Sequence, residues 1–152
     1  MNVVFGVFSI ILGTFIGYKM SEKYVKRKCF YNDLFAFNQV LKTEVSFSHN
    51  SIKKIIKERK TNVVTDYLNE AILKENTNLN VSFLNEEENA FLQSYVKSIG
   101  KSDRESQLEI LSVYEMKIKK KLDFADEEFK KYKKLYPKLG FLIGLIILVV
   151  LL

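Results

Sequence analysis

Hydrophobic residues follow two different patterns along the chain. Unbroken apolar runs cover residues 3–18 and 139–152, and neither run contains a charged side chain. Between them, apolar residues recur at steps of three and four, which is the spacing of one face of an α-helix. The pattern predicts an all-α protein in which a charged bundle of about five to six helices is flanked by an N-terminal and a C-terminal transmembrane helix.

The C-terminal run is short for a membrane span. Residues 139–152 would rise about 21 Å as a helix, against a hydrocarbon core of about 30 Å. A start near Tyr136, with lysine side chains reaching back to the membrane surface, would make up the difference. A buried C-terminal helix is the alternative, but it would not need apolar residues on every side. We therefore predict a transmembrane helix at residues 138–152.

The N-terminal run has a secretory signal peptide as its rival interpretation. Such a peptide begins with basic residues and ends in a small-x-small cleavage site. Only Met1 and Asn2 precede this run, and residues 16–19 are a poor cleavage site. An uncleaved transmembrane helix at residues 1–19 is therefore the better prediction.

Basic clusters adjoin both apolar runs on the side of the central segment. They are Lys19, Lys23, Lys26, Arg27 and Lys28 after the first run, and Lys130, Lys131, Lys133, Lys134 and Lys138 before the second. Lysine and arginine near membrane ends are retained in the cytoplasm. Residues 20–137 are therefore predicted to form the cytoplasmic domain of a cell-membrane protein.

Each apolar run carries two glycines four residues apart, Gly13 and Gly17 in the first and Gly140 and Gly144 in the second. Glycines at this spacing fall on one helix face and let helix backbones approach closely. The four residues are candidates for membrane-helix packing, either of the two helices with each other or of each helix with a partner. The alternative is that glycine is simply frequent in membrane helices.

Periodic segments predict the helices of the central domain. They cover residues 21–48, 51–60, 61–74 and 85–99, followed by a long helix from 103 to about 136. The first has an apolar face formed by Phe30, Leu34, Phe37, Leu41 and Val45. The Asn-rich residues 75–83 are predicted as a connector, and a strand there remains an alternative.

A tight turn between two helices is predicted at Gly100. Upstream, Asn85 and Glu88 can form a capping box at the start of one helix. Gly100 has the place of the left-handed glycine that ends this helix. Ser102 and Glu105 are expected to form a second capping box directly afterwards.

The long helix that follows carries a heptad seam. Its positions are Leu108, Leu111, Glu115, Ile118, Leu122, Ala125, Phe129, Tyr132 and Tyr136. This spacing is typical of a helix that packs along another helix, and Glu115 is its one charged interruption. An antiparallel pairing with the first long helix is favoured over a separate coiled-coil dimer. Pro137 is expected to kink or restart the helix.

No sequence pattern indicates catalysis or ligand binding. The chain has no phosphate-binding loop and no HExxH, CxxC or GxSxG motif, so no enzyme, cofactor, metal or small-molecule substrate is predicted. Cys29 is expected to be a small packing residue and His49 a solvated loop residue. The formal charge is +6, but acids alternate with bases away from the membrane, which argues against nucleic-acid binding.

A further pattern lies in the C-terminal third. Its residues are Gly100, Ser102, Asp103, Arg104 and Gln107 in the turn, then Leu139, Gly140 and Gly144 in the final run. They resemble the Leu-Gly-x-Ser-Asp-Arg-x-x-Gln turn and the Leu-Gly-x-x-x-Gly membrane segment of the stage III sporulation protein AB family of endospore-forming bacteria. Residues 41–45 resemble the family's Leu-x-Thr-Glu-Ile more loosely. Residues 50–52 depart from its Thr-Pro-Leu, and residues 60–84 match little.

The resemblance implies a non-enzymatic membrane component of the channel complex that links mother cell and forespore, placed in the mother-cell membrane. It also implies a helical domain similar to the platform (F) proteins of type II secretion, which sit between a cytoplasmic ATPase and periplasmic rings. The implied partners are the ATPase and the other membrane proteins of the complex, and a homo-oligomer is also open. A generic membrane-anchored adaptor or scaffold outside sporulation is the alternative.

Overall fold

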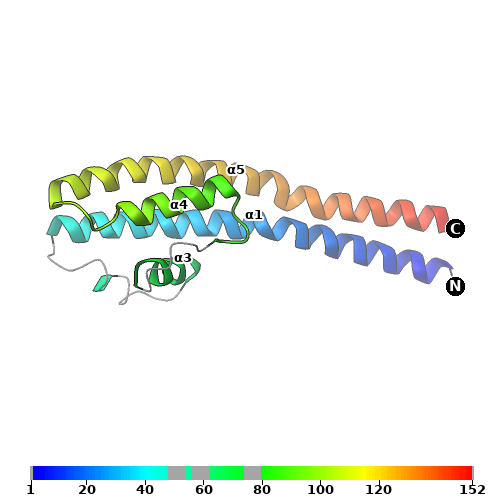
Figure 1. The fold of residues 1–152 in the computed structure, drawn as a ribbon. Coiled ribbons are helices and arrows are strands. Elements are labelled where there is room, and N and C mark those ends of the chain that lie inside the picture. Colours follow the sequence, from blue (N-terminus) through cyan, green and yellow to red (C-terminus); the bar gives the residue numbers. More distant parts are fainter. Residues whose placement is uncertain (1, 48–53, 56–61, 74–79, 152) are drawn as a thin grey trace. The chain divides into compact units, whose positions relative to one another are not determined.

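The computed structural model describes residues 2–47, 54–55, 62–73 and 80–151 (Figure 1). They form α1 (Asn2–Phe47), α3 (Val63–Leu68), the π-helical turn η1 (Asn69–Leu73), α4 (Glu86–Ser98) and α5 (Arg104–Leu151). No strand occurs in these residues, and the predicted all-α class is confirmed. Two compact units are present: unit 1 is Met1–Lys28 with Asp123–Leu152, and unit 2 is Cys29–Leu122.

The predicted number of helices is wrong, because the described residues form four α-helices. The first apolar run and the first central helix are one helix, α1. Residues 18–28 join them without Gly or Pro and consist mainly of good helix formers. Similarly, α5 continues through Pro137 into the second apolar run. The predicted helix at 51–60 lies outside the described residues, apart from two helical residues, Lys54 and Ile55.

The core of unit 2 contains the predicted apolar face of α1. Phe30, Leu34, Phe37 and Leu41 are at most 2% exposed, while Val45 is half-buried. The other helices contribute the buried side chains of Val64, Leu68, Leu92, Tyr95, Ile99, Leu111 and Ile118. Every described helix of this unit therefore shares one hydrophobic core.

In unit 2, α1 and α5 run antiparallel, as predicted. Asn38 of α1 contacts Leu111 of α5, whereas Ser46, later in α1, contacts Arg104, earlier in α5. Each position of the heptad seam within this unit is buried or half-buried. The seam was therefore a reliable indicator of the face that α5 turns towards the rest of the chain.

Local capping signals fix the starts of α3 and α4. The Asn85 side chain accepts from the backbone N–H of Glu88 over 2.8 Å, and the Glu88 carboxylate accepts from the backbone N–H of Asn85 over 3.1 Å. This confirms the predicted capping box. Asn62 and Thr65 form another capping box at the start of α3, which was not predicted from the sequence. Residues 80–85 form turns rather than a strand, and residues 74–79 lie outside the described part.

Unit 1 consists of the two apolar ends, and its segments of α1 and α5 are also antiparallel. Ser9 contacts Gly144, and Tyr24, later in α1, contacts Tyr132, earlier in α5. Many large apolar side chains here are exposed, such as Ile146 at 62%. Among the described residues, one helix is long and apolar enough to cross a membrane by length and composition, namely α1 over Val4–Phe47.

Candidate functional site

A buried glutamine holds the turn between α4 and α5. Gly100 has a φ of 76°, in the left-handed region that glycine adopts without strain. Its backbone N–H donates to Oε1 of Gln107 over 2.8 Å, and the Ser102 hydroxyl donates to the same oxygen over 3.3 Å. Gln107 is 3% exposed, and its Nε2 has no hydrogen-bond partner in the described part of the chain. The tight turn predicted at Gly100 is confirmed.

Asp103, and not Ser102, caps α5. We expected Ser102 and Glu105 to form a capping box, but the helix begins one residue later than that arrangement requires. The Asp103 carboxylate accepts from the backbone N–H of Ser106 over 3.2 Å. Hydrogen bonds from the Ser106 side chain and backbone lower the pKa of Asp103. Ser102 is not available as a cap because its hydroxyl is bonded to Gln107.

Arg104 connects this turn to the end of α1. Its guanidinium Nη2 donates to the backbone carbonyl of Ser46. Ser46 lies in the last turn of α1, where carbonyl groups have no partner within the helix. The five motif residues thus come together in one turn, where their contacts cap helices and join chain segments. These contacts are structural in kind.

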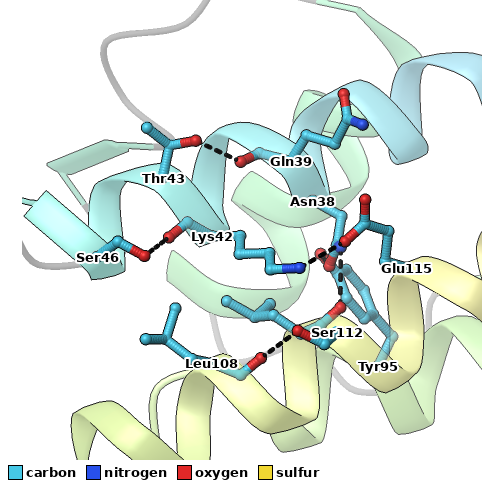
Figure 2. Close-up of polar contacts among 10 residues, drawn as sticks. Asn38, Gln39, Lys42, Thr43, Ser46, Tyr95, Leu108, Ser112 and Glu115 are labelled. Carbon is cyan, nitrogen blue, oxygen red and sulfur yellow. Dashed lines mark hydrogen bonds and ion pairs between the residues drawn. The ribbon is translucent and has the colours of Figure 1, made fainter.

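A buried hydrogen-bond network joins three helices of unit 2 (Figure 2). Asn38 of α1 donates through Nδ2 to the Leu111 carbonyl of α5 over 3.1 Å, and its Oδ1 accepts from the Tyr95 hydroxyl of α4 over 3.0 Å. Asn38 and Tyr95 are both fully buried. Burial raises the pKa of the Tyr95 hydroxyl, which therefore stays protonated as a donor. The network fixes how α1, α4 and α5 align.

The burial of Asn38 was not predicted from the sequence, although a signal for it is present there. Asn38 lies four residues after Leu34 and three before Leu41, within the apolar stripe of α1. A polar residue at such a position is buried, and buried polar groups require hydrogen-bond partners. The partners themselves come from distant segments, so their identity could not be read from the local pattern.

An ion pair accounts for the charged interruption of the heptad seam. Nζ of Lys42 lies 2.8 Å from Oε2 of Glu115, and both side chains are partly buried (Figure 2). The lysine lowers the pKa of Glu115 through its hydrogen bond and charge. Glu115 thus pairs across the α1–α5 contact of unit 2 and does not interrupt it.

The four glycines of unit 1 lie where α1 and α5 approach most closely. A Cβ atom added to Gly13 would overlap the carbonyl oxygen of Gly140, and one added to Gly140 would overlap that of Gly13. Gly144 faces the backbone of α1, and Gly17 faces the Tyr136 carbonyl. The structure therefore brings both predicted glycine pairs into one backbone-to-backbone contact.

Other side chains extend the glycine contact at its two ends, a serine at one end and a cluster of three tyrosines at the other. The Ser9 hydroxyl lies 2.7 Å from the Gly6 carbonyl oxygen and 3.1 Å from that of Gly144. At the other end of the contact, Tyr24 stacks on two rings of α5, those of Tyr132 and Tyr136, at centroid distances of 4.6 and 5.8 Å. Burial, and then the neighbouring Tyr136 hydroxyl, raise the pKa of Tyr24. Tyr132 and Tyr136 belong to the predicted seam of α5, whose face is again the one that contacts α1.

Ion pairs follow the tyrosine cluster in unit 1. Arg27 pairs with Glu128, and Nζ of Lys28 lies 2.6 Å from Oδ1 of Asp126. The pKa of Asp126 is lowered first by Lys130 and then by Lys28. Acidic residues of α5 therefore neutralise some of the basic residues beside each apolar run, namely Arg27 and Lys28 of α1 and Lys130 of α5.

Two expectations about single residues have different outcomes. Cys29 is exposed, so its prediction as a packing residue is wrong. It precedes the buried Phe30 and lies outside the stripe that continues at Leu34 and Phe37. His49 lies outside the described residues. Within the described residues, no group of His, Cys, Asp and Glu could hold a metal ion.

A comparison with protein families matches residues 52–152 to stage III sporulation protein AB. The matched region contains the motif turn and the glycines of α5, whereas α1 lies outside it. Neither the curated proteins nor the solved structures gave a match. The family match spans well over half of the chain and confirms the resemblance seen in the motif residues. This chain therefore belongs to the stage III sporulation protein AB family.

Proposed function

We propose that the chain is a structural membrane component of the channel complex between mother cell and forespore, required for endospore formation. Membership in a family of structural stage III sporulation proteins supports the proposed role in endospore formation. In the proposal, residues 1–19 and 138–152 span the mother-cell membrane as a helical hairpin. Residues 20–137 form a cytoplasmic platform that couples the ATPase of the complex to the membrane assembly.

The main support for membrane insertion is the distribution of side chains in unit 1, where small residues face the helix contact and large apolar residues face outward. Its glycines lie at the helix contact, while large side chains such as Phe5 and Ile146 are 62% exposed. In water, a large exposed apolar surface is unfavourable, by about 25 cal/mol per Å². In lipid the same arrangement is favourable, because small residues let helices pack while large apolar residues face the acyl chains.

The charges of unit 1 support the proposed orientation. All of its basic residues lie between Lys19 and Lys28 or between Lys130 and Lys138, next to the apolar ends and on the side of the central domain. Basic residues in these positions favour retention in the cytoplasm. Unit 2 would then be cytoplasmic, where an ATPase can reach it.

The composition of unit 2 supports a scaffold role. It has fourteen basic and thirteen acidic residues, and the contacts of the motif turn cap and join helices. A near-neutral helical body with a fixed turn suits protein–protein contacts. A generic membrane adaptor outside sporulation is the second candidate. A neighbouring secretion-type ATPase gene and expression during engulfment favour the first candidate, and constitutive expression in a non-sporulating cell favours the second.

The decisive experiment combines deletion with purification of the complex. We expect deletion of the gene to abolish heat-resistant spores and the full chain to restore them. The affinity-tagged chain should retain the ATPase of the complex from detergent-solubilised sporulating cells. Normal spore counts in the deletion strain would reject the sporulation role, and an ATPase that never co-purifies would reject the coupling role.

Topology has its own test. A reporter fused after Leu152 should give a non-cytoplasmic signal, and the same reporter inserted after Asn76, in the Asn-rich connector predicted from the sequence, should give a cytoplasmic one. Neither site lies in the turn between α4 and α5, so both fusions leave the contacts of Gly100 and Ser102 with Gln107 intact. A cytoplasmic signal from the fusion at Leu152 would contradict the proposed orientation.

A further inference from the structure

We propose that the outer face of α5 at residues 130–138 binds the anionic headgroups of membrane phospholipids. The face is a lysine stripe made of Lys130, Lys131, Lys134 and Lys138, all exposed. This inference rests on the membrane insertion proposed above and adds the class of lipid that the inserted chain recognises.

The positive charge of the chain is concentrated in unit 1. That unit has ten basic and five acidic residues, whereas unit 2 has fourteen basic and thirteen acidic residues. No acidic residue follows Glu128, so the lysines of residues 130–138 have no acid between them or after them. Nearly all of the net charge of +6 therefore belongs to the unit with the apolar ends.

Helical geometry places the stripe on the side of α5 away from α1 in unit 1. At 3.6 residues per turn, the four lysines fall within an arc of about 100°. Tyr132 and Tyr136, which stack on Tyr24, lie on the opposite side of the helix. The ammonium groups therefore face outward, away from the helix contact.

Three lysines of the stripe form no ion pair with an acid of the described residues, and two of them, Lys134 and Lys138, also contact no aromatic ring there. Nζ of Lys130 lies 2.5 Å from Oδ2 of Asp126, and Nζ of Lys131 lies 5.2 Å from the centre of the Tyr132 ring. Lys134 and Lys138 form no ion pair within the described part of the chain. They lie four residues apart, on neighbouring turns of one face, so a single anionic group can contact both.

The position of these two lysines favours a lipid over a protein partner. Lys138 immediately precedes Leu139, where the uninterrupted apolar run begins, and Lys134 lies about 6 Å from Lys138 along the helix, further from that run. An anionic membrane surface attracts basic residues within a Debye length, about 8–10 Å in physiological salt. Both ammonium groups thus lie at the depth of the headgroup phosphates if the apolar run is inserted.

The test uses the full chain in a neutral detergent. It is titrated calorimetrically with dioctanoyl phosphatidylglycerol and, in parallel, with zwitterionic dioctanoyl phosphatidylcholine. We expect the anionic lipid to bind more tightly, and the double variant K134Q/K138Q to lose about 25-fold of that affinity, or about fivefold for each lysine. The matched control, K97Q/K120Q, removes the same charge from exposed lysines of unit 2 and should keep the wild-type affinity.

Several results would overturn the inference. Equal affinity for the two lipids, or an unchanged affinity of K134Q/K138Q, would show that the stripe does not recognise headgroup charge. An equal loss in K97Q/K120Q would show a nonspecific charge effect. Competition by inorganic phosphate at matched concentration would assign the site to a free anion, and tighter binding of a polyglutamate peptide would assign it to an acidic protein.

A failure of lipid recognition can be distinguished from a failure of the proposed membrane insertion. K134Q/K138Q keeps both apolar ends, so it should remain in the membrane fraction after carbonate extraction. Loss of lipid preference without loss of insertion is the expected result, whereas wild-type chain missing from the membrane fraction would reject the membrane proposal itself.

Discussion

Units 1 and 2 pair segments of the same two helices, α1 and α5, but with opposite distributions of side chains. In unit 2, Leu34 and Leu41 are fully buried, and the polar side chains that enter the core are hydrogen-bonded. In unit 1, glycines occupy the contact and residues such as Val150 are 79% exposed. Under the membrane insertion proposed above, the same helix pair serves two solvents, with hydrophobic burial stabilising unit 2 and close backbone approach stabilising unit 1.

The largest effect is expected from breaking the polar network of unit 2. Asn38→Ala removes two buried hydrogen bonds and leaves the Tyr95 hydroxyl without its acceptor, which should lower the free energy of unfolding by about 3 kcal/mol. Circular dichroism of the full chain in detergent, during denaturant unfolding, measures this. Asn32→Ala, on an exposed position of α1, is the control. A loss below about 1 kcal/mol would show that the network is not essential to unit 2.

A smaller effect is expected from blocking the close approach in unit 1. Gly140→Leu places a side chain against the Gly13 backbone and should destabilise the helix pair by about 2 kcal/mol. Titration with SDS, followed by circular dichroism, reports the separation of the helices. Ile143→Leu, at a position that is 57% exposed, is the matched control.

The same variant tests assembly. Gly140→Leu should remain in the membrane fraction but lose its partners in a pull-down. Unchanged retention of partners would argue that the glycine contact serves the chain alone.

The motif turn should respond less strongly. Gly100→Ala forces a residue with a side chain into the left-handed region and should cost about 1 kcal/mol in the free energy of unfolding. Denaturant unfolding of the full chain measures it, and Lys101→Ala, exposed and adjacent, should be neutral. Equal stability of both variants would mean that the turn has relaxed to another conformation.

The smallest effect is expected from the Lys42–Glu115 pair. Because the lysine lowers the folded-state pKa of Glu115 below its ordinary value of 4.5, the pair stabilises the fold above that pH and loses its contribution as pH falls through the folded-state pKa. Glu115→Gln should therefore cost about 0.5 kcal/mol at neutral pH, and less as the pH is lowered below 4.5. If the difference in the free energy of unfolding between the wild-type chain and Glu115→Gln did not change with pH, this electrostatic origin would be excluded.

Local patterns predicted the features that depend on neighbouring residues. The apolar face around Leu34, the capping box of Asn85 and Glu88, and the left-handed Gly100 each follow from spacing within one or two helical turns. The motif residues also led directly to the family.

Features that depend on distant segments could not be predicted in the same way. The Asn38–Tyr95 hydrogen bond and the Arg104–Ser46 contact join residues 57 and 58 positions apart. The number of helices was wrong for a related reason. The composition of α1 changes from apolar to charged along its length, but a helix ends only where its backbone or capping requires it.

The glycine contact of unit 1 also has a consequence for entropy. Glycine has no side chain, so no rotamers are frozen where Gly13 meets Gly140. A contact between leucines would have restricted rotatable bonds on both helices. The two ends can therefore associate with little loss of side-chain freedom. In the proposed membrane insertion, their outward-facing residues keep the mobility that a fluid bilayer allows.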